Sequence, residues 1–396
     1  MSYFNAMRGF PEAEYADRVA RAQAAMANHG LAALLLTTER EFRYFTGFLT
    51  RFWESPTRPW FLIVPASGKP VAVVPSIGAP LLERGWLEDI RTWRSPDLND
   101  DGVELLADTL NELSADGRIG LPMGHETHLR MPLADFFRLH SVMGPNRLSD
   151  DRGIMRELRM VKSVAEIEKI RAACSVADRA FARVGEIAAP GKQLDEVFRR
   201  FQILCLEEGA DWVPYLAGGA GPQGYDDVIS PATQAPLAAG DVLMLDTGLV
   251  RDGYFCDFDR NFAISSASDE MRDAHGKLIE ATAAAFDMAK PGALACDLFH
   301  GMDSILTGGK GGAEAGRYGH GLGMSLTEWP SLIADDRTEL VDGMVLTLEP
   351  GIETAPGRML VHEENIVIGA GGAQYLSAPA SAELPILNGA AGGEPA

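Results

Sequence analysis

The sequence predicts a two-domain α/β (α+β) protein, and three observations support this fold class. The chain has 396 residues, more than one hydrophobic core usually holds, and 46% of them are hydrophobic, which allows a core in each half. Short apolar runs alternate with helical patterns along both halves. A capping-box pattern, Ser163-Val-Ala-Glu166, opens a long helical run just after a change of pattern. We therefore expect a first domain over residues 1–155 and a second over 156–388.

The first half begins with a helical pattern that Gly30 ends. Apolar runs typical of strands follow it, two of them joined by a turn at Gly68. These patterns predict a helix over 12–30, strands over 31–36, 60–64 and 71–74, and a helix over 103–113.

In the second half, the helical run from Ser163 is expected to reach residue 188, because Pro190-Gly191 stops it. Further helical patterns cover 194–208, 269–288 and 295–306, and the segments between them are strand-like and carry acidic residues. The Gly-, Ala- and Pro-rich residues 389–396 predict a disordered tail.

Five residues stand out in these segments, since each lies in a Gly-rich or apolar run where a lone charge is costly. Asp246 ends the run 242–246 and Asp257 follows eleven residues later on a second strand-like run, so a hairpin would bring both carboxylates together. His320 lies among glycines, and Glu349 and Glu363 lie on further strand-like runs. Hard divalent cations prefer such oxygen pairs. The pattern predicts an enzyme with a site for two metal ions.

The order and spacing of these five residues resemble those of the pita-bread metallopeptidases, which include aminopeptidase P, prolidase and methionine aminopeptidase. The resemblance implies that Asp246 binds one metal ion and that Asp257 and Glu363 bridge both. His320 and Glu349 would complete the ligand set. Mn, Zn, Co and Fe all suit such ligands, so the sequence leaves the metal open.

Glu363 and Glu364 compete for the last ligand position. The family pattern has two residues between the ligand and three apolar strand residues, which fits Glu363 before Ile366-Val-Ile368. Because side chains alternate along a strand, Glu364 should face the other way.

The first half resembles the N-terminal domain of creatinase and aminopeptidase P. Arg43-Tyr-Phe-Thr-Gly-Phe48 is similar to a strand-and-turn signature of that domain, and Met160-Val-Lys-Ser163 to the junction that follows it. Such proteins usually form homodimers in which N-terminal loops reach a neighbour's site. Trp53, Arg58 and Trp60 are therefore candidates to bind substrate, and core or interface packing is the alternative for the aromatic residues.

Tyr225, at the end of a Gly-rich loop over 218–225, and Trp329 are further candidates to bind substrate.

Two departures from the family pattern bear on catalysis. Where these peptidases usually have histidines, the chain has Ile229 and Thr327, which cannot exchange a proton near neutral pH. Two acidic residues are candidates for catalytic roles in their place. Asp259 would be a ligand or a base, or else the ion-pair partner of an arginine. Glu328 would orient substrate or accept a proton, or else make a structural hydrogen bond.

The resemblance implies a metal-dependent hydrolase similar to Xaa-Pro dipeptidases, which cleaves a small peptide-like C–N bond with a metal-bridging water. One alternative is elimination, as in the dimethylsulfoniopropionate lyase of this fold. That lyase has a similar Glu-aromatic-Pro segment, here Glu328-Trp329-Pro330, but it has an Asp where this chain has Gly248. A creatinase-like amidinohydrolase is another alternative. A non-catalytic binding protein of this fold is less favoured, since all five ligands are retained.

The formal net charge of −21 argues against nucleic acid or an anionic membrane surface as a partner. The sequence has no apolar run of about twenty residues. Its first residues lack a signal-peptide core, so we expect a cytoplasmic location. The four cysteines are scattered and are interpreted as reduced thiols.

Overall fold

The computed structural model describes residues 8–54, 58–311 and 316–388. The chain divides into two compact units, with the boundary between Arg159 and Met160. The tail predicted over 389–396 lies outside the described residues. Among the described helices, none has the length and apolar character needed to cross a bilayer.

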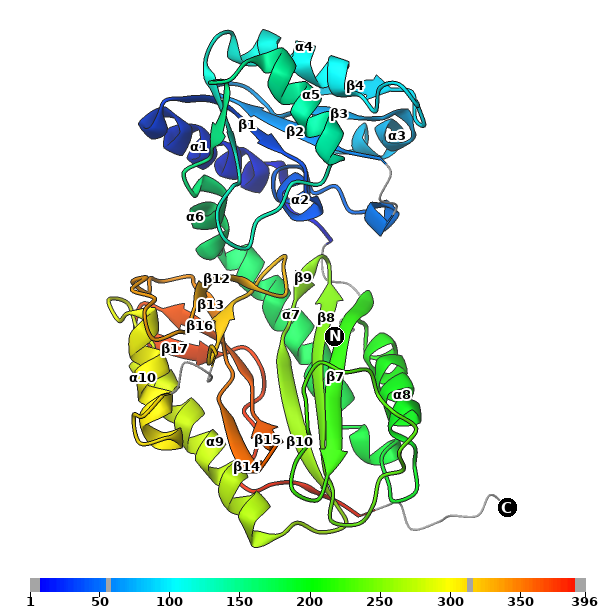
Figure 1. Cartoon of the computed structure of the whole chain (residues 1–396), viewed down its shortest axis with the longest axis vertical. Coiled ribbons are helices and arrows are strands. Elements are labelled where there is room, and N and C mark those ends of the chain that lie inside the picture. The colour runs from blue at the N-terminus through cyan, green and yellow to red at the C-terminus, as the bar shows by residue number, and fades with distance from the viewer. Residues whose placement is uncertain (1–7, 55–57, 312–315, 389–396) are drawn as a thin grey trace. The chain divides into compact units, whose positions relative to one another are not determined.

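The N-terminal unit is built on a six-stranded mixed sheet in the order β4-β3-β2-β1-β5-β6 (Figure 1). Strands β1 and β2 are antiparallel, whereas β5 runs parallel to β1. Its strands are β1 (Leu31–Leu36), β2 (Phe61–Pro65), β3 (Val71–Pro75), β4 (Asp89–Trp93), β5 (Arg118–Leu121) and β6 (Leu148–Asp150). Its helices are α1 (Glu12–His29), α2 (Glu39–Thr46), α3 (Ala79–Leu82), α4 (Val103–Ser114), α5 (Leu133–Met143) and α6 (Ile154–Met160), the last of which reaches the boundary, with 3₁₀ turns at Phe52–Glu54 and Ser76–Gly78.

The core of this unit lies between the sheet and two helices, α4 and α5. Leu35, Ile63 and Leu110 are fully buried in it. Helix α1 ends where the sequence predicted, because Gly30 takes a left-handed conformation (φ 64°) and its N–H caps the last carbonyls.

The strand expected within residues 43–48 is wrong, because Arg43 to Thr46 form the last turn of helix α2. The backbone N–H of Thr38 donates to Glu41 Oε2 at 3.3 Å, which caps the start of the helix. Gly47 ends it with φ 72°. The apolar residues at 42, 44 and 45 are all buried.

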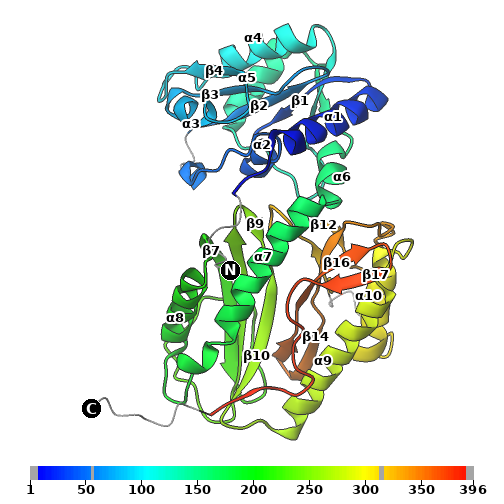
Figure 2. The same ribbon diagram turned by 180° about the vertical axis from the view of Figure 1, so that it is seen from behind.

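The C-terminal unit contains two sheets and four long helices (Figures 1 and 2). One sheet has the order β18-β10-β8-β7 with β9 beside β8, and the other has the order β12-β11-β13-β16-β17. The first comprises β7 (Trp212–Gly221), β8 (Val242–Arg251), β9 (Tyr254–Phe255), β10 (Phe258–Ile264) and β18 (Ile386–Leu387). The second comprises β11 (His320–Gly321), β12 (Glu328–Ser331), β13 (Val345–Leu348), β16 (Glu364–Gly369) and β17 (Gly372–Tyr375), and β14 (Gly351–Ala355) pairs with β15 (Arg358–Val361) as a separate ribbon.

The helices of this unit are α7 (Val164–Phe181), α8 (Leu194–Glu207), α9 (Asp269–Met288) and α10 (Ala295–Leu306). The capping box predicted at Ser163 and Glu166 is present. Helix α7 ends seven residues before the expected position, and a 3₁₀ turn at Val184–Glu186 follows, where Gly185 lowers helix propensity. In Figure 2, α7 crosses the sheet of β8 and β10, while α9 and α10 lie side by side.

Candidate metal centre

Two antiparallel strands place the first pair of acidic residues. Strand β8 pairs with β10 so that Thr247 lies opposite Phe258 and Asp246 lies opposite Asp259. Asp257 comes directly before β10. The hairpin expected from the sequence therefore exists, with its acidic residues on neighbouring strands.

The second sheet supplies the remaining three residues of the predicted set. His320 begins β11, Glu349 follows β13 and Glu363 precedes β16, and these strands are neighbours in the order β11-β13-β16. His320 Nε2 lies 3.5 Å from Asp257 Oδ2 and 3.8 Å from Glu349 Oε2. Asp257, His320 and Glu363 each offer a ligand atom, and these atoms lie within 4.8 Å of one another.

The electrostatics of this cluster favour a bound cation. Burial and then the neighbouring carboxylates raise the pKa of Asp246, Asp257 and Glu363 well above the usual range. Burial raises the pKa of Glu349 to about 7. Burial and then the cation of Arg317 lower the pKa of His320 to about 3, so its imidazole is neutral, as a metal ligand must be.

The donor atoms themselves test whether metal ions fit here. Asp246 Oδ1 and Glu363 Oε1 are buried and have no hydrogen-bond partner among the residues that the structure describes. Buried polar atoms in this state are uncommon, and a bound ion would satisfy them. Carboxylates with one imidazole form a donor set that divalent ions of the first transition row accept. The residues present therefore fit such ions.

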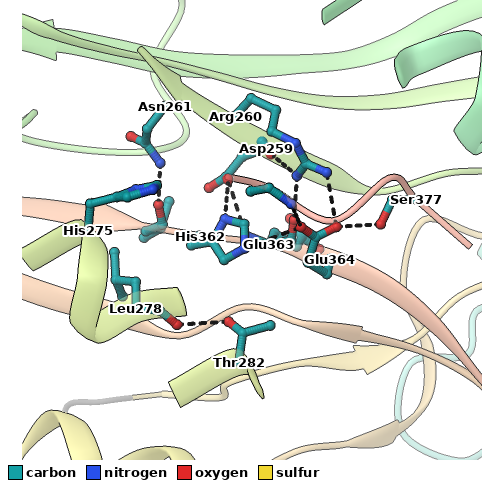
Figure 3. Close-up of polar contacts among 12 residues, drawn as sticks. Asp259, Arg260, Asn261, His275, Leu278, Thr282, His362, Glu363, Glu364 and Ser377 are labelled. Atoms are coloured by element: carbon teal, nitrogen blue, oxygen red, sulfur yellow. Dashed lines mark hydrogen bonds and ion pairs between the residues drawn. The ribbon is translucent and has the colours of Figure 1, made fainter. Parts of the chain in front are cut away.

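Glu363 and Glu364 have different surroundings, which Figure 3 shows. The carboxylate of Glu364 pairs with Arg260 at 3.0 Å and accepts a hydrogen bond from the hydroxyl of Ser377. Burial alone would raise the pKa of Glu364, but the charge of Arg260 together with the contacts of His362 and Ser377 outweighs it, and the pKa falls to about 2. The structure thus places Glu363 in the cluster and Glu364 in an ion pair, which favours Glu363 as the ligand.

Asp259 is buried, and the adjacent Arg260 donates to its backbone carbonyl at 2.5 Å. Its Oδ1 accepts a hydrogen bond from the backbone N–H of Glu363 at 3.1 Å and lies 3.5 Å from Nδ1 of His362 (Figure 3). Nε2 of His362 lies 3.4 Å from Glu364 Oε1. Burial alone would lower the pKa of His362, but these two carboxylates raise it overall. The sequence interpretation missed His362, although alternation along 362–364 indicates that His362 and Glu364 share one side.

Glu328 forms a buried ion pair with Lys162. Its Oε2 accepts from Lys162 Nζ at 3.1 Å and its Oε1 accepts from the backbone N–H of Ser325 at 3.0 Å. The side chains of Lys162 and Glu328 are 1% and 6% exposed. This ion pair fixes the position of the carboxylate, and a catalytic role for Glu328 stays a prediction.

Tyr225 lies in a hydrophobic core cluster of the C-terminal unit, and a substrate contact by this residue stays a prediction. Its side chain is fully buried. Its hydroxyl accepts from the backbone N–H of Val361 at 2.6 Å and donates to Asn261 Oδ1 at 3.2 Å. Trp329 is partly exposed on β12, and its indole N–H donates to Thr338 Oγ1 at 3.0 Å. A substrate contact by Trp329 stays a prediction.

Two of the three N-terminal candidates pack within their own unit. Trp53 and Trp60 are buried with ring centroids 5.6 Å apart, and Phe48 lies 5.3 Å from Trp60. Arg58 is partly exposed, and its guanidinium lies 5.2 Å from the centroid of Phe52. The aromatic pair therefore contributes to the core of this unit, which is the alternative that the sequence left open. Their contact with substrate stays a prediction.

The positions that carry histidine in related peptidases have different surroundings here. The side chain of Ile229 is exposed. Thr327 Oγ1 accepts a hydrogen bond from Arg317 at 3.3 Å, and Nε of the same arginine lies 3.3 Å from Glu349 Oε1. The sequence interpretation missed Arg317, a permanent cation that is 38% exposed beside the cluster.

Residues 168–370 match metallopeptidase family M24, and residues 18–161 match the creatinase/prolidase N-terminal domain. The chain is 31% identical over 373 residues to a probable dipeptidase PepE of Mycobacterium tuberculosis, covering 91% of this chain and 93% of that protein. It is 29% identical to an Xaa-Pro dipeptidase of Pyrococcus furiosus over 64% of this chain and 73% of that protein.

Solved structures agree with these sequence relationships. The crystal structure of dipeptidase PepE from Mycobacterium ulcerans superposes with a TM-score of 0.82 at 29% identity, covering 96% of this chain and 99% of that one. A prolidase from Thermococcus sibiricus has a TM-score of 0.82 at 24% identity, covering 94% of this chain and 98% of that one, and shows the shared fold. The comparisons confirm the predicted family, the fold class and the class of metal-dependent hydrolase.

Proposed function

Because the chain belongs to metallopeptidase family M24, we propose that it hydrolyses dipeptides of the Xaa-Pro class. The named relatives support this substrate class, since they are a probable dipeptidase and an Xaa-Pro dipeptidase. The observation that carries the proposal is the buried cluster around His320. There, carboxylate oxygens of Asp246 and Glu363 are buried without a partner.

We propose that the cluster holds two divalent ions. Asp257, Glu363 and His320 would hold the ions together, because one ligand atom of each lies within 4.8 Å of the others. Asp246 would bind one ion, and His320 and Glu349 would complete the set. Manganese suits this oxygen-rich set well.

When bound, the ions would supply an activated water and polarise the scissile carbonyl. The chain's own residues then bind and orient the substrate. Arg317 is the partly exposed cation beside Glu349, so it is suited to the free carboxylate of a dipeptide. Trp329 and Arg58 are further candidates for substrate contacts.

Elimination at the same centre is the second candidate function. One observation favours it: neither Ile229 nor Thr327 can move a proton, and the side chain bonded to Thr327 is an arginine that stays charged. A peptidase that lacks such proton-transfer groups is expected to be slower by roughly a hundred- to ten-thousand-fold. Strong peptidase activity would therefore count against elimination.

The cysteines and the family resemblance bear on the location and the assembly of the chain. All four cysteines are free thiols and buried, which suits a reducing compartment and supports a cytoplasmic location. A homodimer rests on the family resemblance, and light scattering of the purified protein tests it.

Metal content and substrate scope test the proposal together. Protein purified without added metal or chelator is analysed by mass spectrometry beside an Asp246→Ala variant. About two equivalents in the wild type and fewer in the variant are expected. Both proteins, reloaded with Mn²⁺, are then offered Xaa-Pro dipeptides and dimethylsulfoniopropionate. Proline release supports the proposal, acrylate release without proline supports elimination, and a protein that binds neither Mn²⁺ nor Zn²⁺ contradicts both.

A further inference from the structure

Asp259 lies on the same face of its sheet as the metal centre. It is directly opposite Asp246 in the antiparallel pair of β10 and β8. Side chains of directly opposed residues point to one face, with Cβ atoms roughly 5 Å apart. The carboxylate of Asp259 is therefore a close neighbour of a proposed ligand.

The two oxygens of Asp259 have opposite surroundings. Oδ1 is held by the N–H of Glu363 at 3.1 Å and by Nδ1 of His362 at 3.5 Å. Oδ2 is buried and has no hydrogen-bond partner within residues 8–54, 58–311 and 316–388, and the residue as a whole is 1% exposed. The unpartnered oxygens of Asp246 and Glu363 are in the same state. Three acidic residues around one cluster thus each present an unsatisfied oxygen, where the family pattern accounts for two.

We propose that Asp259 is a sixth protein ligand of the metal centre, with Oδ2 toward the ions and Oδ1 fixed by His362. His362 is then a positioning residue, and Glu364 holds it from the other side at 3.4 Å (Figure 3). Carboxylate–histidine pairs orient ligands in this way at other metal sites. The inference rests on the proposed metal centre but not on the substrate.

An added carboxylate changes which metal the centre prefers. With Asp259 the set has five carboxylates and one imidazole. Oxygen-rich sets of high coordination number suit Mn²⁺, whereas Zn²⁺ favours four ligands that include nitrogen or sulfur. Asp259 is therefore expected to favour Mn²⁺ over Zn²⁺, relative to the same protein without it.

Cobalt titration is the test, because the visible absorption of Co²⁺ reports its coordination number directly. The metal-free forms of the wild type, Asp259→Asn and Asp259→Ser are titrated with CoCl₂. Asp151→Asn is the matched control, since it removes a carboxylate that is similarly buried but accepts hydrogen bonds from the backbone N–H groups of Gly153 and Met155 instead. Thermal unfolding followed by circular dichroism checks that each metal-free protein is folded. Asp259→Ser is included so that a folding defect in Asp259→Asn leaves a second test.

The Asp259 variants are expected to bind at least one Co²⁺ about tenfold or more weakly. Their visible bands should also be more intense, because a lower coordination number gives stronger absorption. Asp151→Asn should keep the wild-type spectrum. Wild-type spectra and affinities in both Asp259 variants would overturn the proposal, and so would one identical change in all three variants. If the wild type binds no Co²⁺, the whole metal centre fails, whereas absent peptidase activity leaves this result unaffected.

Discussion

Replacing Lys162 by methionine tests whether Glu328 is structural or catalytic. The side chains of Lys162 and Glu328 are 1% and 6% exposed, and Lys162 Nζ lies 3.1 Å from Glu328 Oε2. Methionine has a similar length but no charge. In this variant Glu328 would keep the hydrogen bond from the backbone N–H of Ser325 and lose its ion pair with Lys162. Breaking a buried pair from one side costs about 3–5 kcal/mol. For a unit of this size, that corresponds to a loss of roughly 6–20 °C in Tm.

The assay is thermal unfolding of K162M, E328Q and the double variant. Each single variant leaves one buried charge unpaired, so the double variant should regain part of the lost free energy of unfolding. A loss below about 1 kcal/mol in K162M, the range of an exposed pair, would refute the structural reading. An E328Q protein that is as stable as the wild type but inactive would instead support a catalytic role for Glu328.

Three further predictions follow from particular residues. Gly218→Ala should lower the free energy of unfolding by more than about 2 kcal/mol, because Gly218 has φ 145° and a Cβ there would lie 2.1 Å from the carbonyl of Met244. Gly240 has φ 94° and no atom near the position of a Cβ, so Gly240→Ala should lower the free energy of unfolding by less. Urea titration of both variants measures this, and equal losses of free energy would contradict the predicted clash at Gly218. Burial raises the pKa of Asp178 to about 6, so the folded state binds the proton more tightly than the unfolded chain. The stability that this proton provides is complete below pH of about 4 and is lost as the pH rises through 6. Asp178→Asn should therefore gain Tm over the wild type at pH 7.5 but not at pH 4, and a pH-independent difference would contradict this. Removal of bound metal by a chelator should lower Tm, because an ion present at a thousand times its Kd contributes about 4 kcal/mol to the free energy of unfolding. If calorimetry shows the same Tm with and without the chelator, the folded protein does not bind the metal.

Much of the site was predictable because its residues are conspicuous in the sequence. Asp246, Asp257 and Glu363 are carboxylates in apolar runs, where burial demands a partner, and the structure brings them toward one another. The choice of Glu363 over Glu364 followed from the spacing of the family pattern, and strand alternation turns Glu364 to the other face. The helices at 269–288 and 295–306 also occur at the predicted positions, since their apolar spacing and flanking residues are strong local signals.

The remaining features depend on contacts between distant segments. Asp259 and His362 meet only because β10 lies near the segment before β16, across about a hundred residues of sequence. Tyr225 follows a Gly-rich loop, which is typical of an exposed position, yet a contact with Val361 buries it. For these residues, tertiary contacts outweighed the local pattern. Residues 43–46 have the composition of a strand, but local signals, the cap at Thr38 and the stop at Gly47, make them part of a helix.

The most direct test of the account is the hydrolysis of one Xaa-Pro dipeptide by three preparations of the protein. They are metal-free wild type, wild type reloaded with Mn²⁺, and Glu363→Gln reloaded in the same way, with released proline as the readout. The account predicts that only the reloaded wild type releases proline at a substantial rate. Equal release by the metal-free protein, or by Glu363→Gln, would contradict a metal-dependent peptidase centred on these residues.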